Sequence, residues 1–378
     1  MKTIRPVFLF GLLWLSLLSA CVEKTPIQIG YVSELSGKNA GIGVLGRNGA
    51  QLAVDGINAA GGVKGRSLEL LARDSQGQED ALKSADQELI NAGVVALTGH
   101  MASWESIAAL PLIETQKVSL FSPTTSTPLL SGKQDYFFRL IPVNTAQVEP
   151  LADYAFEQLH LHRAAALYDR DNQAFAQTCA EGFLVRFTAL GAEQVAVMPF
   201  SSSAAPDYQQ IVADLRQSNP DVLLIVASAM NTALIAQQVR LSNWSVQMVS
   251  TNWAYTDEFL QNAGRAAEGT LFPSHFNPGC QTPAYLDFKQ KYESAYGQPP
   301  GFAAVLSYET IKVLADVLAQ GGDRPADLAQ ALASSRQVNG LCDKITLDAF
   351  GDAQRSLYLF RVMDGRYQLV QTIEPLQP

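Results

Sequence analysis

Short apolar runs rich in β-branched residues alternate along the chain with longer stretches whose apolar residues recur at helical spacing. The first pair is a strand predicted at 27–32 and a helix predicted at 48–59. The pattern continues with strands at 68–72, 94–98 and 118–121 and helices at 79–90 and 104–115. Strands separated by helices in this way form a parallel sheet that the helices cover.

A second round of the same alternation follows the segment 136–142. Its predicted strands lie at 164–168, 194–198, 222–226 and 247–251. The last hundred residues differ, because helices predicted at 284–296 and 303–319 precede two alternating runs at 357–363 and 367–372. The dipeptide Asp364-Gly365 between these runs is typical of a tight β-hairpin. The pattern therefore predicts two α/β units and a terminal hairpin.

The N-terminus carries the features of an export signal. Lys2 and Arg5 precede an apolar run at 7–18, which at about twelve residues is too short to span a bilayer of about 30 Å. The run ends in Leu18-Ser-Ala-Cys21, which resembles the lipobox of bacterial lipoproteins. We expect residues 1–20 to be a lipoprotein signal peptide, Cys21 to carry lipid, and the protein to be exported and membrane-tethered. The alternative is an ordinary signal peptide that is cleaved near Ala20.

Composition excludes several function classes. The 378 residues suggest two or three domains, and 47% hydrophobic with 17% charged residues is typical of a well-folded chain. The formal net charge of −9 argues against a nucleic-acid partner, which requires clustered lysine and arginine. Only four cysteines and four histidines are present, and His160 and His162 lack a nearby cysteine or carboxylate at ligand spacing. We therefore expect no metal site and no cofactor.

Motifs for catalysis and nucleotide binding are weak. The run Gly41-Ile-Gly-Val-Leu-Gly46 has the letters of a dinucleotide-binding loop, but it begins eight residues after the predicted strand instead of directly behind it. A flexible loop that leads into a helix is the better interpretation. The chain has no Gly-x-Ser-x-Gly, His-Glu-x-x-His or phosphate-loop motif, so we expect a binding protein and not an enzyme.

Small hydroxyl residues follow two neighbouring predicted strands. Ser103 comes shortly after the third strand, and the segment Ser122-Pro-Thr-Thr-Ser126 follows the fourth. Hydroxyl groups and helix N-termini at the carboxyl ends of parallel strands suit an anionic ligand. The alternative is that Ser103 only caps its helix.

Several segments together resemble the type I periplasmic binding proteins, and within them the leucine/branched-chain amino-acid branch. The specific part is the run Asn58-Ala-Ala-Gly-Gly62 with its flanks, 49–54 and 57–66, and the resemblance covers essentially all of the exported chain. Other matching segments, in the same order as in the family, are Leu35-Ser-Gly37, Asp74, Gly99-His100, Ser122-Pro123, Ala267-Glu-Gly-Thr270 and Phe350-Gly-Asp352.

The resemblance implies an α/β fold of two doubly wound parallel-sheet lobes joined by three crossover strands. The crossovers are expected near 139–142, 272–275 and 341–346. The N-terminal lobe would then comprise 22–140 plus 275–340, and the C-terminal lobe 141–274 plus 341–378. The implied function is a solute receptor for the permease of an ABC importer. The alternative is a lipoprotein that passes ligand binding to a membrane signalling protein.

The resemblance also implies ligand-binding positions on both lobes. On the first lobe Ser103, Thr124 and Ser126 would hold the carboxylate of a small-molecule ligand, and Ile42 would shape the pocket. On the second lobe Gln173 or Phe175, Ser228 and Asn252 fall at cleft positions. Trp253 and Trp104 could stack on a ring or an apolar tail.

Asn252 stands where an amino-acid binder commonly has an acidic residue for the ligand's ammonium group. Its neutral amide favours an amide, or an aliphatic or aromatic acid, over a plain branched-chain amino acid, since an unpaired buried ammonium is unfavourable. Asp169, Asp171 and Asp257 are the carboxylates that could replace the missing one.

Cys280 and Cys342 both lie beside implied crossovers, whose strands are expected to be neighbours. An exported protein folds in an oxidising compartment, so we expect these two residues to form a disulfide. Cys179 lies within a predicted helix and is expected to be a buried, unpaired residue.

Overall fold

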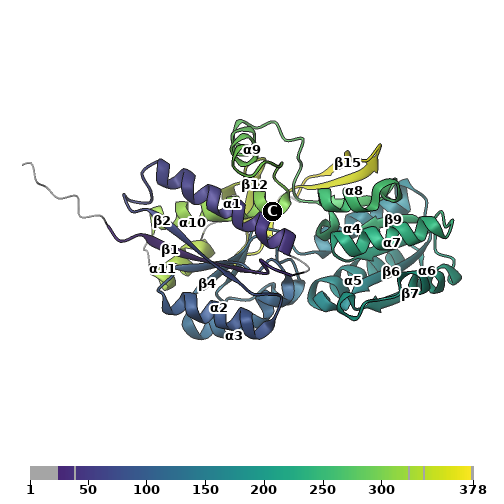
Figure 1. Ribbon diagram of the computed structural model, residues 1–378, viewed down its shortest axis with the longest axis horizontal. Coiled ribbons are helices and arrows are strands. Elements are labelled where there is room, and N and C mark those ends of the chain that lie inside the picture. Colours follow the sequence, from purple (N-terminus) through teal and green to yellow (C-terminus); the bar gives the residue numbers. More distant parts are fainter. Residues whose placement is uncertain (1–23, 38–39, 322–323, 335–336, 376–378) are drawn as a thin grey trace, which may run out of the picture.

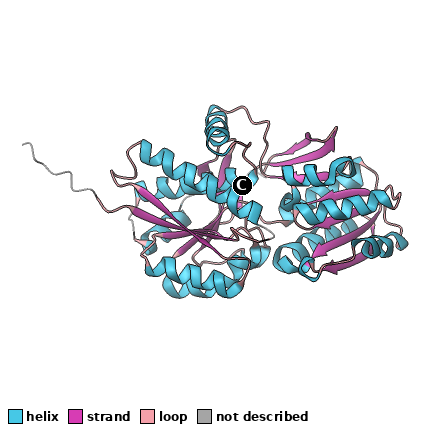
Figure 2. Ribbon diagram, viewed as in Figure 1, coloured by secondary structure: helices cyan, strands magenta, loops and turns pink. Residues whose placement is uncertain are grey.

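The computed structural model describes residues 24–375 apart from 38–39, 322–323 and 335–336. It has two lobes that lie side by side, each a largely parallel sheet between helices (Figures 1 and 2). This arrangement confirms the α/β fold of two doubly wound lobes. The predicted signal peptide and Cys21 lie outside the described residues.

The first lobe contains a five-stranded parallel sheet in the order β2-β1-β3-β4-β5. Its strands are β1 (Ile27–Ser33), β2 (Leu68–Asp74), β3 (Ala96–Gly99), β4 (Ser119–Ser122) and β5 (Phe137–Arg139). Its helices are α1 (Ala40–Ala59), α2 (Glu79–Asn91), α3 (Ser103–Gln116), α10 (Phe302–Gln320) and α11 (Pro325–Ser334). Successive strand residues point to opposite faces. Ala96 accordingly packs with α1, α10 and α11, whereas Leu97 packs with α2 and α3.

Helix α1 begins at Ala40, so the prediction of a flexible loop over Gly41–Gly46 is wrong. Glycines serve here to bring the helix close to its neighbours. A Cβ atom on Gly43 would lie 2.0 Å from the carbonyl oxygen of Glu34, and one on Gly49 would lie 2.0 Å from that of Ala304 in α10. The glycine spacing that imitates a nucleotide-binding loop thus reflects helix packing.

The second lobe contains a seven-stranded sheet in the order β15-β14-β10-β9-β8-β6-β7. Its strands are β6 (Arg163–Asp169), β7 (Glu193–Phe200), β8 (Val222–Val226), β9 (Gln247–Ser250), β10 (Leu271–Ser274), β14 (Leu357–Met363) and β15 (Arg366–Ile373). Its helices are α4 (Thr145–Asp153), α5 (Gln173–Ala189), α6 (Tyr208–Gln217), α7 (Ala229–Leu241) and α8 (Asp257–Ala263). The predicted hairpin is confirmed, with Asp364 and Gly365 both at positive φ, as a two-residue turn of this kind requires.

The remaining elements join the lobes or complete them. Helix α9 (Pro283–Tyr296) follows β10, and β11 (Gln337–Asn339), β12 (Lys344–Leu347) and β13 (Ala353–Gln354) form a small antiparallel sheet. Short turns of other helix types are Pro128–Leu130, Tyr154–Gln158, Arg170–Asn172, Ser202–Ala204, Asn252–Ala254 and Gly264–Ala267.

The chain passes between the lobes after β5, after β10, and between β13 and β14. The first two passages coincide with the crossovers expected near 139–142 and 272–275. The third passage comes later than expected, at 355–356, because Ile345, Leu347 and Ala353 belong to the core of the first lobe. Residues 344–354 therefore lie with the first lobe, whereas the sequence placed everything after 341 in the second.

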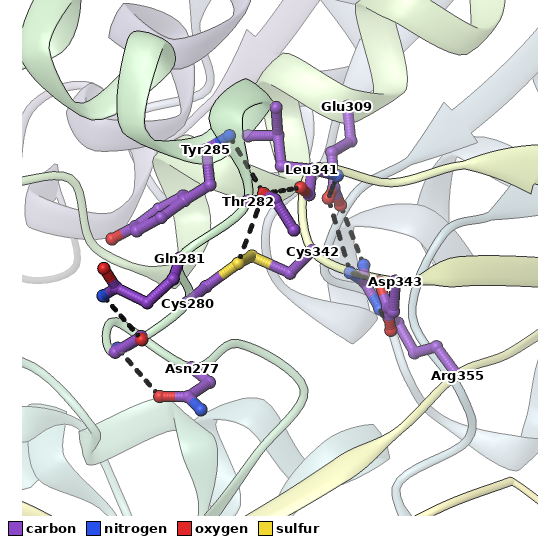
Figure 3. The surroundings of a disulfide bond; sticks show 11 residues. Asn277, Cys280, Gln281, Thr282, Tyr285, Glu309, Leu341, Cys342, Asp343 and Arg355 are labelled. Atoms are coloured by element: carbon purple, nitrogen blue, oxygen red, sulfur yellow. Dashed lines mark hydrogen bonds and ion pairs between the residues drawn. A yellow bond between two sulfur atoms is a disulfide. The ribbon is translucent and has the colours of Figure 1, made fainter.

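A disulfide and a hydrogen bond join the segments near the second and third passages. Cys280 and Cys342 form a disulfide with their Cα atoms 6.1 Å apart, and the hydroxyl of Thr282 donates to the carbonyl of Leu341 (Figure 3). Cys179 is buried and unpaired in α5. At the second passage, Nδ1 of the buried His275 lies 2.8 Å from the carbonyl oxygen of Ser356, which belongs to the third.

His275 makes stability dependent on pH. Burial, with a smaller contribution from the nearby Arg355, lowers the pKa of His275 to about 3. The unfolded chain takes up a proton on this side chain below about pH 6.5, so in that range the unfolded state binds more protons than the folded one. The free energy of unfolding is therefore expected to fall as the pH drops below about 6.5, by at most about 1.4 kcal/mol per pH unit from this residue.

Urea unfolding of the wild type and His275→Asn at neutral and mildly acidic pH measures this contribution. The asparagine amide can still donate to Ser356 but does not titrate, so the variant should lose less stability on acidification. Equal pH dependence of the two proteins would contradict the assignment.

Candidate functional site

A cleft between the two lobes, here called the interlobe cleft, is lined mainly by residues at or just after the carboxyl ends of parallel strands. The first lobe contributes residues that include Ser33, Ile42, Ser103, Trp104, Thr124 and Phe302. The second lobe contributes residues that include Asp169, Asp171, Asn172, Phe175, Asn252 and Trp253. About 720 Å³ of space lies between the walls of the cleft, and this space includes open solvent.

The first-lobe wall of the cleft is built around the N-terminus of α3. Ser103 is the first residue of this helix and only 2% exposed, and its hydroxyl has no hydrogen-bond partner among the described residues. The helix cap is Ala102, so the alternative that Ser103 merely caps its helix is wrong. The N–H groups of a first helical turn have no partners within the helix and carry a partial positive charge. This wall can therefore bind an anion such as a carboxylate.

Three hydrogen bonds hold this wall in place. The hydroxyl of Thr124, a residue that lines the cleft, donates to the carbonyl of Met101 at 2.8 Å. Behind them, the buried carboxylate of Glu105 accepts the hydroxyl of Ser75 at 2.7 Å and the N–H of Ala102 at 3.1 Å. Burial raises the pKa of Glu105. The loop that carries Ser103 is thus fixed before any ligand arrives.

The second-lobe wall is acidic. Asp169 at the end of β6 is 2% exposed, and its Oδ1 accepts the N–H groups of Asp171 at 3.1 Å and Ser202 at 3.2 Å. Asp171 accepts hydrogen bonds from the hydroxyls of Ser201 and Ser202 and from the N–H of Ser203. Although partial burial opposes it, this hydroxyl and amide cradle lowers the pKa of Asp171 and keeps its carboxylate charged.

Aromatic rings complete the second-lobe wall. Phe175 and Trp253 are in edge-to-face contact, with ring centroids 5.8 Å apart. Trp104 and Phe302 face the cleft from the first lobe. The cleft thus combines polar groups at its walls with apolar surface for a hydrocarbon or aromatic moiety.

Six of the nine expected ligand-binding residues line the cleft: Ile42, Ser103, Thr124, Phe175, Asn252 and Trp253. Ser228 lies beside it, in a smaller recess that it shares with Ile42 and Trp253, and its hydroxyl caps α7. Ser126 is fully buried away from the cleft, and its carbonyl accepts the N–H of Asn144. Gln173 is exposed and bonds Gln177 one turn further along α5, so it too lies outside the cleft.

Sequence reasoning did not single out Ser33, Met101, Asn172, Ser202 and Phe302, which also line the cleft. Ser33 ends β1 and Asn172 closely follows β6, so a systematic search of strand ends would have found both. Phe302 begins α10, far along the chain, and no local pattern marks it as a cleft residue.

Within the part of the chain that the structure describes, no group of three or more histidine, cysteine or acidic residues could hold a metal ion. None of the described helices has the length and apolarity needed to cross a membrane.

The family model described as periplasmic binding protein matches residues 26–366. The chain belongs to this family. The match spans both lobes and all three passages between them. The relatives and solved structures that it resembles are named as binding proteins.

Three proteins similar to this periplasmic binding protein differ in the ligands that their names give. A Leu/Ile/Val-binding protein homolog of Brucella melitensis is 23% identical over 354 residues, which cover 92% of this chain and 94% of the relative. The crystal structure of the leucine-binding protein LivK of Thermotoga maritima has a TM-score of 0.85 and 25% identity, covering 92% of this chain and 99% of that one. A solute-binding protein of R. palustris in complex with 4-hydroxybenzoate has a TM-score of 0.83 and 20% identity, covering 94% and 98%.

Proposed function

We propose that this protein is the extracytoplasmic receptor of an ABC importer and binds a small carboxylate-bearing solute, an amino acid, an amide or a related organic acid, in the interlobe cleft. The observation that carries the proposal is Ser103, which faces the cleft at the N-terminus of α3 and whose hydroxyl has no partner in the described part of the chain. Leucine and 4-hydroxybenzoate, named for two of the similar proteins, both carry a carboxylate that such a wall can receive.

Ligand binding would drive closure of the lobes. A ligand shifts an equilibrium between open and closed forms only when it interacts more favourably with one of them. The anion-binding wall belongs to the first lobe, whereas Asn252 and Trp253 belong to the second. A solute that touches both walls therefore favours the closed form, which the permease would recognise.

Ser103→Ala tests the anion-binding wall. Loss of a hydrogen bond to a charged group costs about 1.5–3 kcal/mol, so the variant is expected to bind the solute about tenfold to hundredfold more weakly. Isothermal titration calorimetry with the small carboxylate that the wild type binds most tightly measures the change. Gln173→Ala is the matched control, because this residue lies outside the cleft and should leave affinity unchanged. Equal affinity of Ser103→Ala and wild type would refute the assigned wall.

We also propose that Cys21 anchors the protein by lipid. Stable anchoring needs more than one acyl chain, which bacterial lipoproteins carry on this cysteine. Replacement of Cys21 by serine should move the exported protein from the membrane fraction to the soluble fraction. Cys179→Ala should leave its distribution unchanged. A Cys21→Ser protein that stays with the membrane would rule out the lipid anchor.

A further inference from the structure

His100 is a buried histidine behind the anion-binding wall of the first lobe. It follows β3 directly, comes three residues before Ser103, and is 0% exposed. Its φ of 48° lies in the left-handed region, which histidine adopts more readily than most residues other than glycine. The chain therefore makes a constrained turn at His100 just before it forms the wall.

The main-chain groups of His100 join this turn to neighbouring strands. Its N–H donates to the carbonyl of Val32 in β1 at 2.6 Å. Its carbonyl accepts the hydroxyls of Ser122 at 3.2 Å and Thr125 at 2.9 Å. His100 thus links β1 to the segment after β4, and its position fixes the start of the loop that carries Ser103.

The ring of His100 interacts with two buried carboxylates. Its Nε2 lies 3.0 Å from Oδ1 of Asp86 in α2, which is itself 0% exposed, and Glu105 in α3 is the second carboxylate. Within the described part of the chain, no lysine or arginine pairs with either of them. A buried carboxylate without a counter-ion is unfavourable. A protonated His100 supplies that counter-ion.

Electrostatics sets the charge of this ring. Nδ1 of His100 has no hydrogen-bond partner among the described residues, so no neighbouring group locks the ring in one protonation state. Although burial opposes it, the charge and hydrogen bond of Asp86 and the charge of Glu105 raise the pKa of His100. The ring therefore keeps its proton to a higher pH than an exposed histidine, which loses it near about pH 6.5.

The other titratable groups nearby act through Glu105. Glu34, which follows β1, adds to the effect of burial in raising the pKa of Glu105, whereas His100 opposes it. Tyr31 in β1 stays neutral, because burial and the charge of Glu105 raise its pKa. Strand β4 brings only uncharged side chains to this region. His100 and Glu105 are thus the two groups whose protonation can change close to the wall.

We propose that His100 is a positioning residue for the anion-binding wall and that its bound proton strengthens carboxylate binding at Ser103. Within the described residues, several carboxylates and no lysine, arginine or histidine line the interlobe cleft. A positive charge behind the wall offsets part of their repulsion of an anionic ligand. The inference rests on the proposed function, because it concerns the same wall.

Ligand binding and protonation of His100 are then linked. If the proton favours the bound carboxylate, the carboxylate favours the bound proton by the same factor. The affinity should stay constant while the ring is protonated in the free protein, and it should fall as the pH rises through the pKa of His100. Binding in that pH range should also take up protons from the buffer.

Calorimetric titration of the wild type at about pH 6 and about pH 8.5 measures this linkage. The probes are L-leucine, L-phenylalanine, isocaproate and benzoate. Those that bind are expected to do so about fivefold or more weakly at the higher pH. Titrations at about pH 7.5 in two buffers of different ionisation enthalpy should show proton uptake. Any titration of the probe itself is the same for every variant and cancels when variants are compared.

Two variants assign the effect to its residues. In His100→Gln the amide can still donate to Asp86 but does not titrate, so the variant should bind about fivefold more weakly at about pH 6 and lose most of the pH dependence. Asp86→Asn keeps the ring and the wall but removes the charge that favours the proton, so its affinity should fall at a lower pH than that of the wild type. His162→Gln, on the exposed surface of the second lobe, is the control and should keep the wild-type profile.

The outcomes separate this inference from the proposed function. If the wild type binds its probes equally well at both pH values, or if His100→Gln keeps the wild-type pH dependence, the coupling is wrong and the carboxylate receptor stands. If His100→Gln weakens binding by the same factor at every pH, the residue has a structural role only, and the coupling is again wrong. If none of the four probes binds, both proposals fall. The proton uptake by the wild type needs no variant to fold.

Discussion

Replacing Arg355 by methionine is expected to lower the free energy of unfolding by about 3–5 kcal/mol, because it leaves one buried and one largely buried carboxylate without their partner. Arg355 lies in the third passage between the lobes and is 4% exposed. Its guanidinium bonds Glu309 of α10 at 2.8 Å and Asp343 at 2.7 Å (Figure 3). Although burial opposes charging, the two carboxylates raise the pKa of Arg355, so the group stays charged.

The same cluster also fixes the backbone near the passage. Oε1 of Glu309 accepts the N–H of Leu341 at 2.7 Å, next to the disulfide. Urea unfolding followed by circular dichroism measures the loss. Arg186→Met is the matched control, since its ion pair with Asp153 is partly exposed and should contribute far less. A loss in Arg355→Met no larger than that of the control would show that the cluster does not stabilise the fold.

Removing the disulfide by Cys280→Ala together with Cys342→Ala is expected to cost about 4 kcal/mol of stability on the chain-entropy model. The two cysteines are 62 residues apart, so the bond closes a long loop that contains α9, α10 and α11. Because α10 and α11 pack on the sheet of the first lobe, the unfolded chain without the bond gains freedom over a large part of that lobe.

Two measurements check the disulfide separately. A thiol titration of the denatured, unreduced protein should find Cys179 as the one free thiol apart from Cys21, and urea unfolding should show the lower stability of the double variant. Three free thiols apart from Cys21, or an unchanged unfolding midpoint in the double variant, would contradict the bond.

The sequence predicted most of the fold because strand and helix periods are local properties. The buried run of β8 has the predicted bounds, and the Asp364-Gly365 turn selects its hairpin by backbone conformation alone. The start of α1 was missed because its glycines, which disfavour a helix in isolation, are required by contacts with Glu34 and Ala304. The third passage between the lobes was misplaced for a related reason. Tertiary contacts decide which lobe Ile345 packs against, and a local sequence pattern does not show them.

The sequence predicts which residues reach the cleft when the order of strands and helices alone places them there. It predicts them less well when the direction of a side chain decides. Ser103 and Thr124 follow strand ends, so the fold class alone brings them to the cleft. Gln173 and Phe175 are two residues apart on α5, and only Phe175 turns inward while Gln173 bonds along the helix surface. The hydrogen bonds that Oδ1 of Asp169 accepts from the N–H groups of Asp171 and Ser202 depend on the fold of two separate turns, which a sequence does not show.

The most direct test of the account is a thermal-shift screen of the protein against amino acids, amides, and aliphatic and aromatic acids, run in parallel on the wild type and Ser103→Ala. A true ligand at about a hundredfold excess over its dissociation constant should stabilise the wild type by about 2.7 kcal/mol. We expect at least one small carboxylate to do so, and we expect Ser103→Ala to lose most of this stabilisation at the same concentration. A screen in which no small carboxylate stabilises the wild type, or in which Ser103→Ala responds as strongly as the wild type, would contradict it.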